Sequence, residues 1–155
     1  MALWNGRKGD GAMIDATVEI PKGWTLMDPP DGVALVASEP TPTRAVRANL
    51  VVNVVPQPVD GNPVPYLENV VAALVSTLEA AEVQQVWVMG HPGDPTFSQR
   101  LLIRYRLNNT AVDLIQQHTW IDGSVIVVSA TASADLPAEE AHILNRCLDS
   151  VGLAA

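Results

Sequence analysis

The sequence contains very little cysteine and no long apolar run, and each shortage excludes a class of structure. Cys147 is the only cysteine among 155 residues, so the chain cannot form an internal disulfide. No segment approaches the ~20 consecutive apolar residues that a membrane-spanning helix needs. Since 48% of the residues are apolar and 17% are charged, we expect a globular core without disulfides or metals.

Positive charge is also scarce. The chain carries nine Lys and Arg residues against seventeen Asp and Glu residues, for a formal net charge of −8. A field of this sign repels the phosphates of nucleic acids and anionic lipid headgroups. We therefore expect an acidic protein that binds neither nucleic acid nor an acidic membrane. The oligomeric state stays open.

The motifs of common catalytic and cofactor sites are missing. His91, His118 and His142 are widely separated, and no HExxH, CxxC or His-x-His spacing occurs, so we expect no metal site. There is also no G-x-S-x-G elbow and no phosphate-binding glycine motif. Cys147 falls on the apolar face of a predicted helix, without the electropositive surroundings that activate a thiol. The pattern favours a protein that is not an enzyme and has no cofactor.

The beginning of the chain differs in composition from the rest. Residues 1–12 are rich in glycine and polar side chains, so we expect a flexible tail there and a single domain over 13–155. Arg7 and Lys8 are not followed by an apolar stretch of roughly 7–15 residues, so this segment is not typical of a secretory signal. We expect a cytoplasmic protein.

Seven segments are typical of β-strands, because they are rich in alternating or β-branched apolar residues and are bounded by turn residues. They are 16–20, 32–38, 47–55, 83–89, 99–107, 112–121 and 124–132. Asp122-Gly123, between the last two, is a strong hairpin signal. Between 99–107 and 112–121 we expect a turn over 108–111, which places Arg106 opposite Asp113. Opposite charges at such a pair would support this register.

Two segments have helical periodicity. Over 64–83, apolar residues recur on one face, while Glu68 and Glu79 lie on the other. The second helix is expected from about Asp135 to Val151, with acidic residues in its first turn, where the helix dipole favours negative charge. Together, the elements predict an α+β fold with an antiparallel sheet of six to seven strands flanked by two main helices.

Three features of the chain occur together in one known family. The elements follow the order β-β-β-α-β-β-β-β-α, Pro21-Lys22-Gly23-Trp24 ends the first strand, and Leu148-Asp149-Ser150-Val151 lies in the closing helix. This combination resembles the Mog/PsbP-like superfamily over about 16–153. Thr119-Trp120-Ile121 before a turn, with 125–132 after it, is most similar to the bacterial LpqN-like branch, and the DcrB-like branch is the other candidate.

The resemblance implies a PsbP-like α/β/α sandwich. It also implies binding roles more often than catalysis, including adaptor or chaperone work, and it supplies no catalytic residues. The chain departs from the LpqN-like pattern because it has no N-terminal lipobox cysteine. Membrane anchoring is therefore not expected.

Three arginines on one predicted strand form a candidate ligand site. Arg100, Arg104 and Arg106 share strand parity, so they point to one face of the sheet. They are three of the nine positive charges of the chain, and guanidinium groups can hold carboxylates or phosphates bidentately. The alternative is a solvated sheet face on which Asp113 neutralises Arg106.

The loop His91-Pro92-Gly93-Asp94-Pro95 is a second candidate site. His91 and Asp94 could form an acid–base pair there. The same residues are also typical of a turn.

These observations favour a non-catalytic binding module for a protein or peptide, which acts as an adaptor, chaperone or regulator. The sequence does not identify the ligand. The alternative is a small-molecule enzyme or carrier that uses a cavity between sheet and helix, with His91 and Asp94 at its mouth. A deep pocket converging on ionisable groups would favour this alternative, whereas a shallow exposed groove would favour the binding module.

Overall fold

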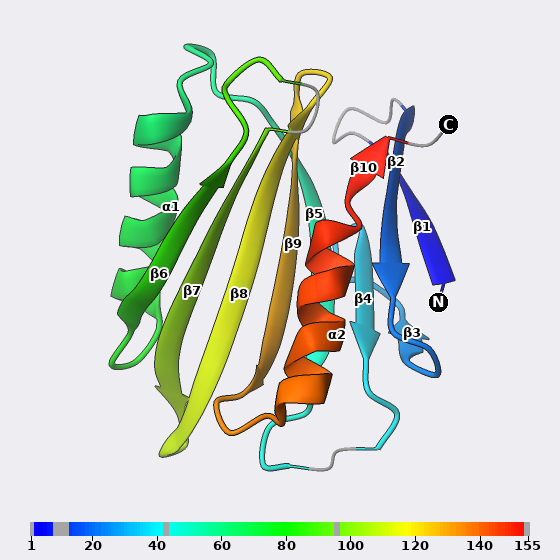
Figure 1. Ribbon diagram of the computed structural model, residues 1–155, viewed down its shortest axis with the longest axis vertical. Coiled ribbons are helices and arrows are strands. Elements are labelled where there is room, and N and C mark those ends of the chain that lie inside the picture. The colour runs from blue at the N-terminus through cyan, green and yellow to red at the C-terminus, as the bar shows by residue number, and fades with distance from the viewer. Residues whose placement is uncertain (1, 8–12, 42–43, 95–96, 154–155) are drawn as a thin grey trace.

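The computed structural model describes residues 2–7, 13–41, 44–94 and 97–153. In these residues, a seven-stranded antiparallel sheet, a three-stranded sheet and two helices are present. Figure 1 shows helix α1 (Pro63–Thr77) behind the large sheet and helix α2 (Ala138–Asp149) in front of it. The expected α+β fold and antiparallel sheet are confirmed.

The large sheet contains most of the strands. Its order is β3-β4-β5-β9-β8-β7-β6, with every neighbouring pair antiparallel. The bounds are β3 (Thr25–Met27), β4 (Leu35–Ser38), β5 (Asn49–Pro56), β6 (Glu82–Met89), β7 (Ser98–Leu107), β8 (Thr110–Ile121) and β9 (Ser124–Ser133). β6 and β3 are therefore the two edges.

The small sheet corrects two expectations. Its order is β1-β2-β10, from β1 (Ala2–Arg7), β2 (Met13–Ile20) and β10 (Gly152–Leu153). The segment 16–20 was expected beside the other strands but lies in this second sheet, because an alternating pattern indicates an apolar face without indicating the pairing partner. A flexible tail was expected over 1–12, yet Ala2–Arg7 pairs with β2. Strand pairing is made by main-chain hydrogen bonds, so this segment can form a strand although it contains no long apolar run. Residues 1 and 8–12 lie outside the described residues.

The β7–β8 hairpin has a tighter turn than expected. Asn108 and Asn109 both have left-handed backbone, with φ of 50° and 65°, which allows a two-residue turn of the kind that Asn tolerates. Leu107 consequently lies opposite Thr110, and Arg104, not Arg106, lies opposite Asp113. The expected four-residue turn over 108–111 was wrong. The hairpin at Asp122-Gly123 is confirmed.

Helix α1 is shorter than its apolar pattern predicted. Its N-cap Asn62 accepts a hydrogen bond from the backbone N–H of Val64 at 3.0 Å, which satisfies one of the free donors of the first turn. The predicted helix continued to residue 83, but Leu78 is extended and Ala80 is left-handed, with φ of 53°. The chain needs this reversal to enter β6. Within the described ranges, no helix combines the length and apolar character needed to cross a membrane.

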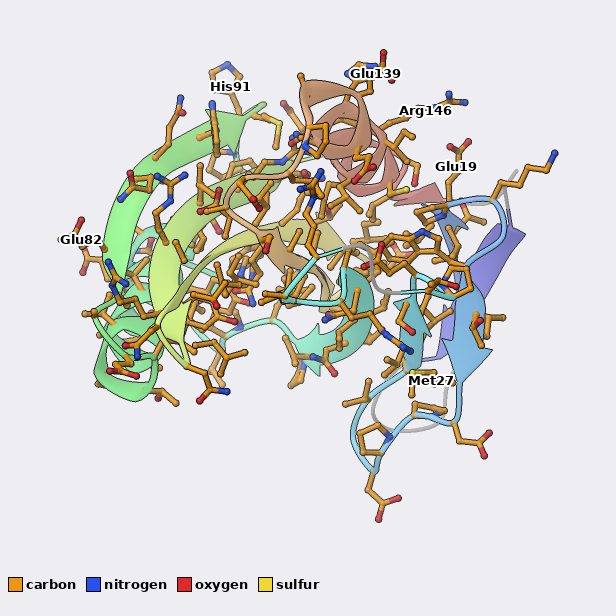
Figure 2. All side chains as sticks on the ribbon, turned by 90° about the horizontal axis from the view of Figure 1, so that it is seen from below. Glu19, Met27, Glu82, His91, Glu139 and Arg146 are labelled. Atoms are coloured by element: carbon orange, nitrogen blue, oxygen red, sulfur yellow. The ribbon has the colours of Figure 1, made fainter. Side chains whose placement is uncertain are left out.

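The main core lies between the large sheet, α2 and the small sheet. The members of this cluster with the least exposure are Val18, Ile20, Ala37, Leu50, Val52, Ile126, Val128, Ala130, Cys147 and Leu148. α2 is also attached to β2, because Ser150 Oγ accepts a hydrogen bond from the backbone N–H of Glu19 at 2.7 Å. Figure 2 shows Arg146 close to Glu19, and their side chains are 3.7 Å apart. This half of the molecule is thus closely packed.

Candidate functional site

The edge strand β6 exposes apolar side chains. Val83, Val86 and Val88 are 40%, 46% and 61% exposed. Among the described strands, only β7 pairs with β6. Figure 1 shows β6 at the edge of the sheet with α1 behind it. The exposed valines therefore lie where the sheet ends.

The strand register directs two of these valines toward α1. Val86 lies opposite Leu101, and Val88 lies opposite Gln99. Gln99 belongs to the face under α1, because its Nε2 donates a hydrogen bond to the carbonyl oxygen of Pro63 at 2.9 Å. Directly opposite residues of an antiparallel pair point to the same face. Val86 and Val88 therefore face α1 across the sheet edge.

Between α1 and β6 lies a groove of about 520 Å³. Its sheet side is formed by Val86, Val88 and Gln99. Its helix side is formed by a stripe along α1, composed of Val64, Leu67, Glu68, Val71, Ala72 and Val75. We call this feature the α1–β6 groove. It is an open, mainly apolar surface between a helix and a free sheet edge.

α1 packs less closely on the sheet than α2 does. All fifteen residues of α1 are described and none is fully buried, whereas α2 buries Leu144, Cys147 and Leu148. Val64 and Val75, on the groove side of α1, are 61% and 42% exposed. α1 therefore presents one apolar side to the sheet and leaves a second one in the groove.

The sequence carried a signal for this groove that periodicity did not reveal. Glu68 is the single Asp, Glu, Lys or Arg among the fifteen residues of α1. A surface helix with one apolar stripe normally carries charged residues on its opposite face. The near absence of charge from a helix at the surface therefore indicates a second apolar contact. We predicted one apolar face and missed the second.

The charge of the groove is negative. Glu68 is the single ionisable residue among the nine that line it. None of these nine described residues is Lys or Arg, and the whole chain carries a net charge of −8. The groove thus favours a partner that combines apolar side chains with positive charge.

A buried polar network supports the N-terminal half of α1. The hydroxyl of Tyr66 on α1 lies 2.6 Å from Nδ1 of His118, and Nε2 of His118 lies 2.7 Å from Oε1 of Gln116. Gln116 Nε2 then donates to Ser129 Oγ at 2.9 Å. Burial lowers the pKa of His118 to about 4 and raises the pKa of Tyr66 to about 12.

The network is consistent with an uncharged histidine. In the neutral imidazole, one ring nitrogen donates and the other accepts. Gln116 Oε1 is an acceptor, so Nε2 carries the proton and Nδ1 accepts from Tyr66. His118 is only 2% exposed, and both of its ring nitrogens are engaged. This arrangement anchors α1 and leaves no free nitrogen for proton transfer to a ligand.

A second chain of hydrogen bonds joins the same helix to the sheet. Nε1 of Trp120 donates to Oε1 of Gln99 at 3.1 Å, while Nε2 of Gln99 donates to the carbonyl oxygen of Pro63. Tyr66 also contacts Trp120 edge to face, with ring centroids 5.3 Å apart. The first turn of α1 is therefore fixed by several directional contacts.

The predicted arginine site is only partly free to bind a ligand. Arg100 is 8% exposed, its Nε donates to Gln117 Oε1 at 2.8 Å, and its NH2 lies 2.5 Å from Asp149 Oδ1. Arg104 makes two hydrogen bonds to Asp113, at 2.8 and 3.1 Å. These contacts join β7 to β8 and α2.

Arg106 is the least engaged of the three arginines. Its side chain is exposed, and its NH1 lies 3.4 Å from the carbonyl oxygen of Asn109. Parity places Arg100, Arg104 and Arg106 on the same sheet face, but two of the guanidinium groups already hold carboxylates. A ligand-binding role for these arginines stays a prediction.

The loop site has a turn at its centre. The backbone N–H of His91 donates to Oδ2 of Asp94 at 2.9 Å, so this carboxylate stabilises the turn. Figure 2 shows the ring of His91 pointing outward. A cavity of about 470 Å³ lies nearby, lined by Asp94, Phe97, Trp120 and Asp122 among others, whereas His91 does not line it. The loop role of His91 and Asp94 also stays a prediction.

The sole cysteine lies in the main core. Cys147 is fully buried, and burial raises the pKa of its thiol to about 11. A thiol in this state is a poor nucleophile, as its place on the apolar face of the last helix predicted.

Comparison with known proteins identifies the fold. No protein-family model matches the chain, and no curated protein does so. Among solved structures, cyanobacterial PsbP (CyanoP) of Synechocystis sp. PCC 6803 is similar with a TM-score of 0.70 and 16% identity, over 99% of this chain and 93% of that chain. LpqN of Mycobacterium tuberculosis, described as involved in cell envelope biogenesis, is similar with a TM-score of 0.69 and 14% identity, over 99% and 91%.

A eukaryotic protein has the same architecture. The Saccharomyces cerevisiae Ran-binding protein Mog1p is similar with a TM-score of 0.63 and 12% identity, over 99% of this chain and 96% of that chain. Identities this low show a shared fold alone. The chain has the Mog/PsbP-like fold, and the fold that the resemblance implied is thereby confirmed.

Proposed function

We propose that this domain is a non-catalytic binding module that holds an apolar segment of another protein in the α1–β6 groove. The observation that carries the proposal is the convergence of exposed valines from two elements. Val64 and Val75 on α1 face the same groove as Val86 and Val88 on β6. Contiguous exposed apolar surface of this kind is typical of interaction sites.

The charge distribution defines the partner further. A segment with Lys or Arg beside its apolar residues would pair with Glu68 and would be attracted by the acidic chain. An acidic segment would be repelled. The proposed ligand is thus an apolar and basic stretch of polypeptide.

The fold neighbours support a role of this type. Mog1p is described as a Ran-binding protein, so this architecture is used elsewhere to bind a protein. The groove itself is shallow and open, as is usual for peptide recognition and unlike an enclosed small-molecule site.

The small-molecule alternative has one observation in its favour. The cavity of about 470 Å³ beside the 91–94 loop is lined by Asp94 and Asp122. Asp94 already accepts the hydrogen bond of the turn, and His91 does not line the cavity. The predicted acid–base pair therefore does not converge on this space, and the peptide-binding function has the stronger support.

A selection from a random dodecapeptide library displayed on phage tests the proposal. Peptides enriched on the wild-type protein should bind a Val75→Glu/Val88→Glu variant at least ~10-fold more weakly. The matched control is Leu26→Glu/Ile143→Glu, which changes two exposed apolar residues outside the groove, 58% and 43% exposed, by the same charge. Equal binding of the peptides to all three proteins would contradict the proposal.

A further inference from the structure

We infer that the partner segment binds as an added β-strand on the free edge of β6 and inserts alternate side chains into the α1–β6 groove. The inference rests on the proposed function, because it takes the groove as the binding site. It adds the conformation of the partner and the main-chain groups that recognise it.

The edge of β6 has few of the features that normally block strand addition. Edge strands are usually protected by proline, by charged side chains, by bulges or by short length. β6 has eight residues and a single irregularity, where the register shifts between Val83 and Gln85. The run 85–89 contains neither charge nor proline. The opposite edge, β3, has only three residues.

The main chain of this run has one unused side. In the part of the chain that the structure describes, β7 pairs with one side of β6 and no strand pairs with the other. An extended segment placed there would pair with the outward N–H and C=O groups of 85–89. Such main-chain bonds supply affinity in strand addition, while pockets for alternate side chains supply specificity.

The groove lies on the correct face for an added strand. Successive side chains of a strand point to opposite faces, so every second side chain of the partner would lie on the α1 side, beside Val86 and Val88. There it would contact the exposed valines of the helix, Val64 and Val75. A five-residue strand is about 17 Å long, which fits within the roughly 22 Å length of a helix of this size.

The remaining side chains of the partner would lie on the other face of the sheet. Trp87 points to that face, opposite Arg100 in the register, and is half-buried. Aromatic residues stabilise β-branched or aromatic neighbours on an adjacent strand. Side chains on both faces of the added strand would thus contact apolar residues, so we expect Val, Ile or aromatic residues along the segment. We also expect a Lys or Arg beside Glu68.

Two other occupants fit the same surface less well. A helix could contact the groove, but it would leave the outward main-chain groups of β6 without partners. A second copy of this chain, paired edge to edge about a twofold axis, would place two Glu68 carboxylates in one joint groove between molecules that each carry a charge of −8. Like charges oppose that contact. A basic, extended segment of another protein would pair with the outward main-chain groups of β6 and would carry a charge opposite to that of Glu68.

Backbone N-methylation of a bound peptide tests this mode directly. The probe is the most enriched dodecapeptide from the phage library, synthesised as a series with one N-methyl group at each successive position. In an added strand, only every second N–H points to β6. Methylation at one parity should therefore weaken binding at least ~10-fold, while the other parity should change the Kd by no more than about twofold.

The possible outcomes distinguish this inference from the proposed function. If binding requires Val75 and Val88 but tolerates methylation at both parities, or if enriched peptides repeat apolar residues every three to four positions, strand addition is wrong and the groove proposal survives. If no enriched peptide depends on the groove valines, both are wrong. Sedimentation equilibrium of the free protein addresses the second copy, because a dimer that is lost in Val75→Glu/Val88→Glu would overturn the inference.

Discussion

The hydroxyl of Tyr66 lies 2.6 Å from Nδ1 of His118, which joins the first half of α1 to a buried residue of the large sheet. One helical turn before Tyr66, the carbonyl oxygen of Pro63 accepts a hydrogen bond from Gln99. These contacts position the helix without burying its whole apolar surface. α1 can therefore remain in place beside β6 while Val64 and Val75 stay exposed.

The first prediction concerns the stability of the protein in acid. Burial lowers the pKa of His118 from 6.5 to about 4. As the pH falls, His118 is therefore protonated in the unfolded state at a higher pH than in the native state. The contribution of neutral His118 to the free energy of unfolding is complete above about pH 7, and it is lost as the pH falls from 6.5 toward 4. By pH 4, the loss should be about 3 kcal/mol.

Urea unfolding of wild type and His118→Gln across this range measures the effect. Carboxylates contribute to acid sensitivity in both proteins, so they cancel in the comparison. The free energy of unfolding of wild type should fall more steeply with decreasing pH than that of the variant. Parallel curves would show that His118 is not buried in its neutral form.

The second prediction isolates the Tyr66 hydroxyl. Tyr66→Phe removes the donor to Nδ1 of His118 and leaves a buried acceptor without a partner, which should destabilise the protein by roughly 1–3 kcal/mol. Tyr105→Phe is the matched control, because among the described residues the Tyr105 hydroxyl has no hydrogen bond. The control should change the free energy of unfolding by less than about 0.5 kcal/mol. Equal effects of both substitutions would contradict this account of α1.

The third prediction separates two arginines of the same strand. Arg100→Ala removes the buried contact to Gln117 and the partly buried contact to Asp149, and it should destabilise the protein by roughly 2–3 kcal/mol. Arg104→Ala removes a more exposed pair with Asp113 and should cost less than about 1 kcal/mol. Thermal or urea unfolding measures both. If Arg100→Ala changed the free energy of unfolding only slightly, Arg100 would not be needed for stability and would be available to bind a ligand.

The fourth prediction compares the packing of the two helices. Leu148 on α2 is fully buried, so Leu148→Ala should leave a cavity and destabilise the protein by roughly 2–5 kcal/mol. Leu74 on α1 is only half-buried, and Leu74→Ala should cost about half as much. Equal losses would show that α1 is packed against the sheet as tightly as α2, which would contradict this account.

The local signals in the sequence located most of the fold. Alternation and turn residues predicted β7, β8 and β9 to within about two residues at each end, because these strands are long and their hairpins carry Asn108-Asn109 and Asp122-Gly123. The pairing of β10 with β2 was not predicted, since it depends on where α2 places the end of the chain. The pairing of β1 with β2 was missed because 1–12 was expected to be a flexible tail. β3 was missed because it has three exposed residues.

The candidate site was harder to predict than the fold. The arginines were conspicuous in the sequence as charges on one strand parity, but their partners Gln117 and Asp149 come from β8 and α2, which only the tertiary structure brings together. The groove valines lie on a helix for which periodicity predicted a single apolar face, and on a strand for which no buried or exposed face was predicted. Burial depends on how much surface a neighbouring element covers, and α1 covers less than its pattern suggested.

Mapping a bound peptide on the protein tests the central claim most directly. The measurement is a titration of ¹⁵N-labelled protein with the most enriched dodecapeptide, followed through the backbone amide resonances. The account predicts that the largest shifts fall on β6, from Val86 to Met89, and on the groove side of α1, including Glu68 and Val75. Shifts that instead centre on Arg100 and α2, or on the 91–94 loop, would contradict it.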